Sequence, residues 1–537
     1  MPRRRPLWRP VTSVYRHLPG ELEHLSDTFF ASLTAPVHDV TPRASPGPDP
    51  SRGAPVSPAE PPPPAALLAA LARADAAQRT GDHATAIAAF ADARALAPHD
   101  LALGLAHANA CRLAGQPEAE LAVLRALAAG DDHADLAQTY ALGAALLAAG
   151  EAALAVEAFE PVARARANDD AALCALAGAL RTAGAPERAW PLVRRALALA
   201  PDAGPVLLAA AQVRHDLGDL AGAHEWLARA EVARPDHAGT RLQGAWTSLL
   251  GGASADGWAR YEARALPTPD TPARRWRGEP LAGGSVLVAA EQGIGDQLQF
   301  LRFVRSLRTH GAGDVIVECH PQLLPLLSSQ PTHWADVRFV ARGAPPVTDW
   351  YVPLLSLPLQ LACDTDVQGT AVPYLAAPRE AGDTPPLPAP VAGRRRLGLV
   401  WAGNPVFPGR ATRDFDVSRL PDLVALPDVQ WIALQQGTAG DLDLPGVHRL
   451  SPLRDWRDTA TLLAQLDGLV TTDTGIAHLA GAMGVPTWVL LAKVPDWRWG
   501  LTGDTTPWYP SARLVRATRS GSWAGVVEAL HAALRQT

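Results

Sequence analysis

Residues 468–491 read GLVTTDTGIAHLAGAMGVPTWVLL. The apolar run from Gly468 predicts a buried strand that ends at the turn Thr471-Thr472-Asp473-Thr474-Gly475. A short helix follows, and Gly484-Val485-Pro486 leads into a second apolar strand. Strand, helix and strand in this order form a βαβ unit, in which the two strands run parallel. Because ligands of parallel sheets bind at the carboxyl ends of the strands, this stretch predicts an α/β domain with a site near residue 473.

The surrounding chain repeats this alternation of strands and helices. Four β-branched runs precede a proline-rich break at 382–393: SVLVAA (285–290), DVIVECH (314–320), DVRFVAR (336–342) and DWYVPL (349–354). The runs RLGLVWAG (396–403), VQWIALQQ (429–436) and TWVLLAK (487–493) belong to the second set. Two sets divided by such a break predict two Rossmann-like lobes, 273–390 and 391–537, with the active cleft between them.

The preceding region, 66–270, is periodic. Glycines recur at nearly equal intervals, as Gly81, Gly115, Gly150, Gly184 and Gly218. After the first of them come Ala86, Phe90 and Pro98, and the alanine recurs with the same spacing in later copies. The interval and the pattern resemble the tetratricopeptide repeat, a helix pair with a fixed period. Stacked pairs form a solenoid with a concave face that typically binds peptides, although such an array can also serve only as a spacer or a dimerisation device.

Composition limits the remaining classes of function. The 537 residues carry a net charge of −6, which gives no reason to expect a nucleic-acid partner. Residues 1–65 include a segment rich in proline, serine and glycine, which predicts a disordered region. The four cysteines form no C-x-x-C pair. No apolar run is long enough to span a bilayer, and we expect a cytoplasmic protein with no membrane span.

Three turns at the ends of predicted strands carry candidate site residues. The first is Gly293-Ile294-Gly295-Asp296, in which the glycines permit a tight turn before a helix. The second is the turn Ala402-Gly403-Asn404-Pro405, where the backbone can approach a ligand and Asn404 can hydrogen-bond one. The third is Asp473-Thr474-Gly475 with His478 one helical turn later. The free N–H groups at the start of that helix suit a phosphate.

The first turn also begins like a dinucleotide-binding fingerprint. The third glycine is replaced by Leu298, however, and the acid expected after the second strand is matched only loosely by Glu318. An oxidoreductase is therefore the weakest of the interpretations, and Asp296 could also be a simple helix cap.

Taken in order, several segments resemble one family. They are EQGIGDQLQFLRF, LVWAGNP, DWRDTATLLAQLDGLVTTDTGIAHLAGA, VPDWRWG and PWYPSARLVR. They are similar to the heptosyltransferase-like glycosyltransferases of family 9, which have the GT-B fold. The similarity is strongest to the branch that is fused to tetratricopeptide repeats and includes flagellin glycosyltransferases. The resemblance covers about residues 66–537 and implies a helical solenoid followed by a two-lobed GT-B domain, an α + α/β fold.

The resemblance also implies roles for individual residues. Asp296 matches the general base of the family. Asp473, Thr474, Gly475 and His478 match its loop for the donor's diphosphate or nucleotide, and the glycines and Asn404 of the first two turns are assigned to donor binding with them. The family's reaction would use a nucleotide-sugar as donor substrate with no cofactor and, we expect, no metal. In the branch an Arg-Ser pair follows the second turn, whereas this chain has Arg413-Asp414, whose carboxylate would repel a phosphate.

Aromatic residues near the third turn add a further expectation. Trp497 and Trp499, with Trp508 and Tyr509, could stack on a sugar or a base, although packing in a core explains them as well. The sequence thus predicts an inverting bacterial glycosyltransferase that moves a sugar from a nucleotide-sugar to a protein acceptor, flagellin being one candidate, held by the repeats. The alternative is a non-catalytic interaction scaffold with an inactive glycosyltransferase-like domain.

Overall fold

The structure is a computed structural model that describes residues 64–130, 134–252, 254–269, 271–330, 334–343, 345–362, 372–378, 384–404 and 412–536. Most of the predicted disordered segment 1–65 lies outside these residues. The described residues up to Val213 form one compact unit, and those from Arg214 onward form a second. Each unit is treated by itself below.

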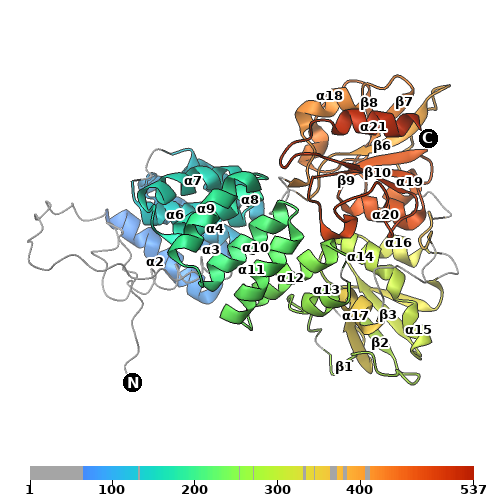
Figure 1. Cartoon of the computed structure of the whole chain (residues 1–537), viewed down its shortest axis with the longest axis horizontal. Coiled ribbons are helices and arrows are strands. Elements are labelled where there is room, and N and C mark those ends of the chain that lie inside the picture. The colour runs from blue at the N-terminus through green and yellow to red at the C-terminus, as the bar shows by residue number, and fades with distance from the viewer. Residues whose placement is uncertain are drawn as a thin grey trace, which may run out of the picture. The chain divides into compact units, whose positions relative to one another are not determined.

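Helices fill the first part of the chain, as the glycine period predicts. The first unit contains α2 (Ala65–Thr80), α3 (His83–Leu96), α4 (Leu101–Leu113), α5 (Pro117–Ala128), α6 (Leu136–Ala148), α7 (Ala152–Ala165), α8 (Asp170–Thr182), α9 (Pro186–Leu199) and most of α10 (Gly204–Asp216). Consecutive helices pack as pairs, drawn from blue to green in Figure 1. The second pair, whose repeat is degenerate in sequence, still forms.

Local chemistry explains where these helices begin and end. The side chains of Asp82, Asp100 and Asp169 each accept a backbone N–H at the start of a helix. Each periodic glycine ends the first helix of a pair with a positive φ, between +68° and +83°. The period continues one step beyond the sequence prediction, because Gly252 follows Gly218 at the same interval and has φ +83°.

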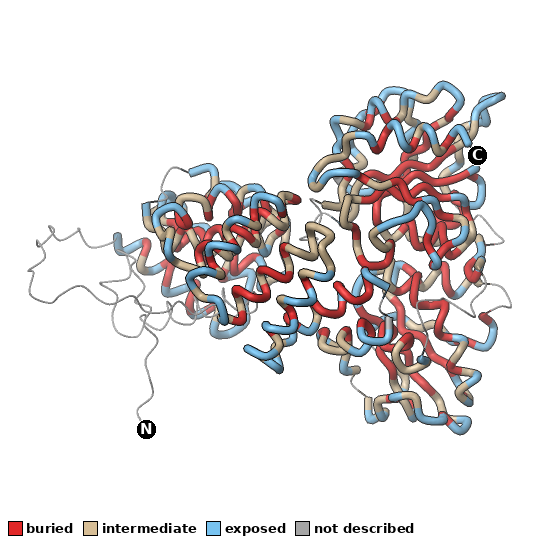
Figure 2. Tube along the Cα trace, in the orientation of Figure 1, coloured by how far each residue is buried: buried red, intermediate tan, exposed pale blue. Residues whose placement is uncertain are grey.

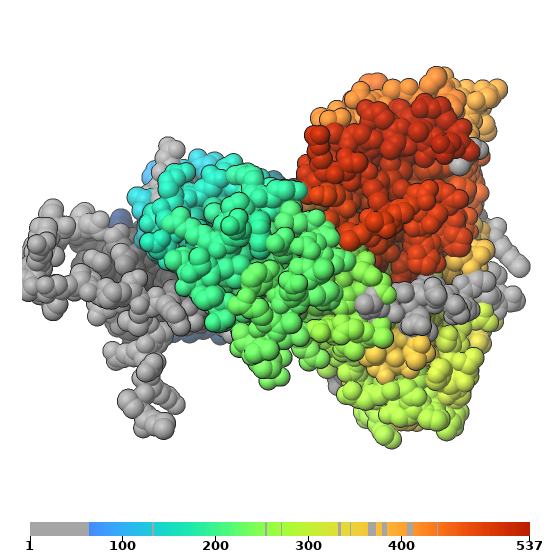
Figure 3. All heavy atoms as spheres, viewed as in Figure 1, coloured from blue at the N-terminus to red at the C-terminus, as the bar shows by residue number. Residues whose placement is uncertain are grey.

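The second unit begins with three more helices, α11 (Leu220–Ala233), α12 (Ala238–Leu250) and α13 (Ser254–Tyr261). The sequence predicts a final capping helix over 257–266, but α13 begins and ends earlier. Residues after Tyr261 turn toward the first sheet, where Arg264 is buried. In the space-filling view the green residues of these helices meet the red residues of the C-terminal lobe, where α12 packs on the 3-10 helix η8 (Trp497–Trp499) (Figure 3).

Two parallel sheets form the rest of this unit. The first has the order β1-β5-β2-β3-β4, and its strands are β1 (Arg274–Arg275), β2 (Val286–Ala289), β3 (Val315–Cys319), β4 (Val337–Ala341) and β5 (Trp350–Pro353). The second has the order β11-β10-β9-β6-β7-β8, and its strands are β6 (Arg395–Val400), β7 (Val429–Ala433), β8 (Val447–Arg449), β9 (Gly468–Thr472), β10 (Thr487–Leu491) and β11 (Ala512–Arg516). We refer to them as lobe 1 and lobe 2.

Short helices connect the strands. In lobe 1 they are α14 (Ile294–Phe300), η2 (Leu301–Phe303), α15 (Ser306–Thr309), α16 (Leu324–Ser328), η4 (Leu354–Ser356) and α17 (Leu357–Gln360). In lobe 2, besides η8, they are η6 (Val417–Arg419), α18 (Leu420–Leu423), η7 (Thr438–Asp441), α19 (Trp456–Leu463), α20 (Gly475–Met483) and α21 (Val526–Arg535). Two of them matter for the site: α14 follows β2, and α20 follows β9.

One apolar core joins these parts of the second unit. It contains Trp258 of α13, Phe300 of α14, Leu479 of α20 and Trp497 of η8, and so runs from the last repeat helices through lobe 1 into lobe 2. A separate core covers the other face of the second sheet. Figure 2 shows the central strands of both sheets as buried. The predicted fold class, a helical solenoid followed by a two-lobed α/β region, is confirmed.

Candidate active site

The three turns predicted from the sequence are neighbours in the structure. A Cβ atom placed on Gly295 of the first turn would lie 2.9 Å from Cδ2 of His478 and 3.2 Å from Cα of Gly475, both in the third. A Cβ atom on Gly403 of the second would lie 3.6 Å from Cγ2 of Thr474. Turns that are far apart in the sequence therefore meet at one place between the lobes.

The glycines of the first turn have different environments. Gly293 is exposed, and its backbone N–H donates to Oδ2 of Asp296 at 2.9 Å. Gly295 instead sits where α14 crosses α20, and its missing side chain lets the two helices touch. A role of Gly295 in donor binding stays a prediction, whereas its role in bringing the lobes together follows directly from these distances.

The second turn is held by the acid that departs from the family pattern. Oδ1 of Asp414 accepts the N–H of Gly403 at 2.9 Å, and Oε1 of Gln435 accepts the N–H groups of Trp401 and Ala402. The carboxylate at 414 thus closes the turn. Asn404 is exposed, which leaves its predicted contact with a ligand open to test.

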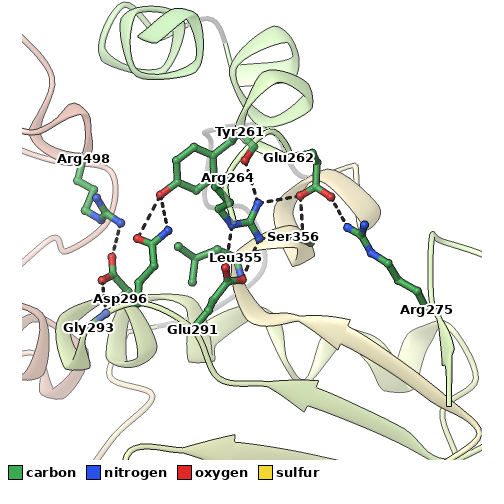
Figure 4. A network of polar contacts seen from close by, with 11 residues as sticks. Tyr261, Glu262, Arg264, Arg275, Glu291, Gly293, Asp296, Leu355, Ser356 and Arg498 are labelled. Atoms are coloured by element: carbon green, nitrogen blue, oxygen red, sulfur yellow. Dashed lines mark hydrogen bonds and ion pairs between the residues drawn. The ribbon is translucent and has the colours of Figure 1, made fainter. Parts of the chain in front are cut away.

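Asp296 lies at the third position of α14 with one-fifth of its side chain exposed. Its Oδ2 accepts from Gly293, and its Oδ1 pairs with Nη2 of Arg498 in lobe 2 (Figure 4). Each carboxylate oxygen has two acceptor positions, so neither bond exhausts the ability of Asp296 to accept a proton. The helix-cap and general-base interpretations of this residue are therefore compatible.

A chain of alternating charges leads from Asp296 to Asp473. Arg498 donates through Nη1 to Oδ1 of Asp496 at 2.8 Å, and Oδ2 of Asp496 accepts from Nη2 of Arg413 at 2.9 Å. Arg413 Nε lies 3.3 Å from Oδ2 of Asp473. No motif in the sequence predicts charge partners for either arginine. We call these five residues the ion chain; it contains three carboxylates and two guanidinium groups.

The members of the ion chain differ in protonation. Burial raises the pKa of Asp473, and neighbouring Arg413 only partly opposes this shift. Burial also acts on Asp496, but Arg498 and Arg413 outweigh it and lower the pKa to about 2. Burial alone would lower the pKa of Arg498, but Asp496 and Asp296 raise it above the ordinary value for arginine. Asp496 is thus ionised at pH 7, and Asp473 holds a proton more easily than Asp496 does.

His478 is buried on α20 with an exposed fraction of 4%. Its Nδ1 lies 3.0 Å from the hydroxyl of Tyr509, and its ring stacks on Trp499 at 5.4 Å between centroids. Burial lowers its pKa to about 3, so the ring is neutral at pH 7. A neutral ring can form a hydrogen bond with a ligand but carries no charge. The predicted contact of His478 with a phosphate is therefore a hydrogen bond and not an ion pair.

The third turn presents the start of α20 less simply than expected. Thr474 is the N-cap residue, but its side chain makes no capping bond, and its Oγ1 lies 2.9 Å from Oγ1 of Thr471. Gly475 is half-buried against Trp456 and Gly295. The two tryptophans expected to stack on a ligand are also buried, Trp497 at 7% and Trp499 at 2% exposure, so stacking would require the aromatic core to open.

Glu318, the acid of the dinucleotide interpretation, is engaged within lobe 1. Its Oε2 accepts the N–H of Ala290 at 3.1 Å, and its Oε1 accepts that of Gly343 at 3.0 Å. These bonds tie the ends of neighbouring loops, so the carboxylate of Glu318 has a structural role within lobe 1. Among the described residues there is also no group of three or more His, Cys, Asp or Glu side chains arranged to hold a metal ion.

None of the described helices combines the length and the apolar character that a bilayer crossing needs.

Comparisons with known proteins add limited information. No family model matches the chain. Protein FlbA of Caulobacter vibrioides is 26% identical over 380 residues, which cover 63% of this chain and 62% of FlbA, less than two thirds of that protein.

Three solved structures each match between 31% and 38% of this chain. The MamA protein is 16% identical, and the match covers 32% of this chain and 93% of MamA with a TM-score of 0.27. YrrB, a tetratricopeptide-repeat protein with an unusual peptide-binding site, is 18% identical over 31% of this chain and 86% of YrrB, with a TM-score of 0.26. A tetratricopeptide-repeat protein from Parabacteroides merdae is 13% identical, and the match covers 38% of this chain and 81% of that protein with a TM-score of 0.32. Scores this low support no argument, and the assignment of repeats rests on the helix pairs described above.

Proposed function

We propose that this chain is a glycosyltransferase that moves a sugar from a nucleotide-sugar to a hydroxyl of a protein acceptor bound by its helical repeats. One observation carries the proposal. The turn that bears Asp296 in lobe 1 packs against the Asp-Thr-Gly-x-x-His loop of lobe 2, with Gly295 touching Gly475 and His478. The two motifs that the family resemblance pairs in one reaction are therefore adjacent.

The chemistry assigns a task to each side. Asp296 takes the proton of the acceptor hydroxyl while the oxygen attacks the anomeric carbon of the sugar. The bond from that carbon to the diphosphate breaks, and the nucleoside diphosphate leaves with the electron pair. Arg498 pairs with Asp296, and Arg413 is the second cation of the ion chain. Both could stabilise the leaving diphosphate by exchanging a carboxylate partner for phosphate oxygens.

The acceptor site is proposed for the repeats. Solenoids of helix pairs offer a concave surface, and peptides are their usual partners. Flagellin is one candidate acceptor, suggested by the branch of the family that the sequence resembles.

A scaffold without activity is the alternative, and one observation favours it. Arg413 and Arg498 each pair with two carboxylates of the ion chain, so both guanidinium groups are engaged without a ligand. The two functions differ in whether a nucleotide-sugar binds.

Thermal unfolding with a panel of nucleotide-sugars separates them. A donor present at 100 times its dissociation constant adds about 2.7 kcal/mol to the free energy of unfolding. A shift of the melting temperature with one donor supports the transferase, and the absence of any shift across the panel supports the scaffold.

The role of Asp296 is tested by Asp296→Asn in the full chain. Loss of a general base lowers turnover by about 10²- to 10⁴-fold, while donor binding remains. Asp349→Asn is the matched control: Asp349 also belongs to lobe 1, but it bonds Ser285 at the opposite ends of the strands. Turnover of Asp296→Asn within a few fold of wild type would remove Asp296 from the mechanism.

A further inference from the structure

The segment that ends the repeats lies against the candidate active site. We call residues Trp258–Arg264 the cap segment; it comprises the end of α13 and the turn after it. The cap segment and both lobes belong to the same compact unit. Figure 4 shows Tyr261 and Arg264 of this segment near Glu291, which lies in the loop between β2 and α14, and near Asp296 in the first turn of α14.

Arg264 fixes Glu291 in that loop. Its Nε and Nη2 donate to the two carboxylate oxygens of Glu291, each at 2.8 Å, and both side chains are about 5% exposed or less. Oε1 of Glu291 also accepts the N–H of Leu355 at 2.8 Å. A bidentate pair between a guanidinium group and a carboxylate has a defined geometry, so it fixes the position of the loop that follows β2.

Tyr261 bonds the next residue, Gln292. Its hydroxyl lies 3.2 Å from Oε1 and 2.9 Å from Nε2 of Gln292. Gln292 has a φ of +54°, a backbone conformation that residues other than glycine rarely adopt. Such a conformation persists only where its surroundings enforce it, and the hydroxyl of Tyr261 is the contact that reaches this side chain from the repeats.

The cap segment supports the other side of the site as well. The ring of Trp258 meets that of Trp497 at 5.3 Å and that of Phe300 at 5.7 Å between centroids, and Tyr261 meets Trp497 at 6.3 Å. Trp497 directly precedes Arg498, the partner of Asp296. The same segment therefore backs both members of the ion pair that joins the lobes.

We infer that Tyr261, at the end of the repeats, is a positioning residue for the transfer site: it holds the Gln292 turn so that Asp296 faces lobe 2. The inference rests on the proposed function for its catalytic consequence, whereas its structural part stands alone. On this view the site is incomplete without α13, whose last residue is Tyr261.

The test uses the full chain with Tyr261→Phe, which keeps the ring packing and removes only the hydroxyl. Tyr140→Phe, a half-buried tyrosine of α6, is the matched control. Hydrogen exchange of the amides in 290–297 should quicken by about 3- to 10-fold in Tyr261→Phe, as expected for one lost hydrogen bond, and remain unchanged in the control. In transfer assays kcat should fall by a similar factor, and by more than KM for the donor changes, because the lost bond holds the turn that precedes Asp296 and leaves the Asp-Thr-Gly-x-x-His loop of lobe 2 in place.

Gln292→Gly supplies the second arm. Glycine adopts the positive φ without strain and has no amide for Tyr261 to hold, so adding Tyr261→Phe to it should change exchange by less than about twofold. Equal effects of Tyr261→Phe in both backgrounds, or unchanged exchange in the single variant, would overturn the inference. If exchange quickens as expected but the wild type transfers no sugar from any donor, the proposed function fails while the positioning of the turn stands.

Discussion

The repeats and the candidate site use glycine for opposite purposes. In the repeats, Gly81 and Gly115 end helices with positive φ, and no heavy atom would lie within 4 Å of a Cβ placed on either. At the site, Gly295 lies inside a helix, and a Cβ there would collide with the opposite lobe. The first use is set by the local chain and recurs with a period. The second is set by a partner in the other lobe, distant in the sequence, and leaves no pattern.

The largest expected effect on stability comes from His478, which is buried at the candidate site. His478 has a pKa of about 3 in the folded protein, against about 6.5 when unfolded. Below pH 6.5 the unfolded chain binds a proton that the folded chain does not, so stability is complete above pH 6.5 and is lost as the pH falls toward 3. Between pH 6.5 and 4.5 the loss from this residue amounts to about 2 kcal/mol.

Urea unfolding followed by tryptophan fluorescence measures that loss. Among the described residues Trp190 is the one tryptophan of the first unit, so the signal reports mainly the second. His478→Gln cannot titrate and should flatten the acid dependence by the stated amount, whereas His99→Gln, at an exposed position of the repeats, should not. An unchanged acid dependence in His478→Gln would mean that the ring is solvated.

The next effect is the glycine contrast itself. Gly295→Ala would place a methyl group 2.9 Å from His478, whose ring is held by Tyr509 and Trp499, and 3.2 Å from the backbone of Gly475. Since neither neighbour can move easily, we expect a net loss of about 1–2 kcal/mol despite the better helix propensity of alanine.

Gly178→Ala in α8 is the matched control for that variant. Nothing would lie within 4 Å of its methyl group, so the same substitution should stabilise the first unit by about 0.5–1 kcal/mol. The two free energies of unfolding are compared in urea at pH 7. A neutral or stabilising Gly295→Ala would show that the lobes can separate at this crossing without penalty.

The same contrast explains what the sequence could predict. The repeats follow from spacing and capping, rules that act within a few residues, and Gly252 shows that even the sixth copy carried the signal. The three turns of the site were also predictable, because the carboxyl ends of parallel strands collect at one edge of a sheet. The division into two lobes also predicted a cleft between them, whereas the pairing of the first turn with the third across that cleft depended on the resemblance to a family.

The ion chain and the cap segment were not predictable in this way. Arg498 and Asp296 are 202 residues apart, and neither belongs to a motif that specifies the other. Arg264 and Glu291 look like ordinary surface charges in the sequence, and only the fold buries them together. Trp497 and Trp499 drew attention as ligand-stacking rings because composition gives the number of aromatic residues but not which faces are covered.

The smallest expected effect concerns the periodic glycines that end helices in the repeats. Gly115 has φ +68° and open space around it, so Gly115→Ala costs only the strain of a left-handed backbone, about 1 kcal/mol. Gly115→Asn should cost less, because asparagine tolerates that conformation. Urea unfolding followed by far-ultraviolet circular dichroism measures both. Equal stability of the alanine variant and the wild type would mean that the periodic glycines are not needed to end these helices. A stability that falls from wild type to Gly115→Asn and then to Gly115→Ala would show that backbone geometry alone, without packing, requires glycine at this periodic position.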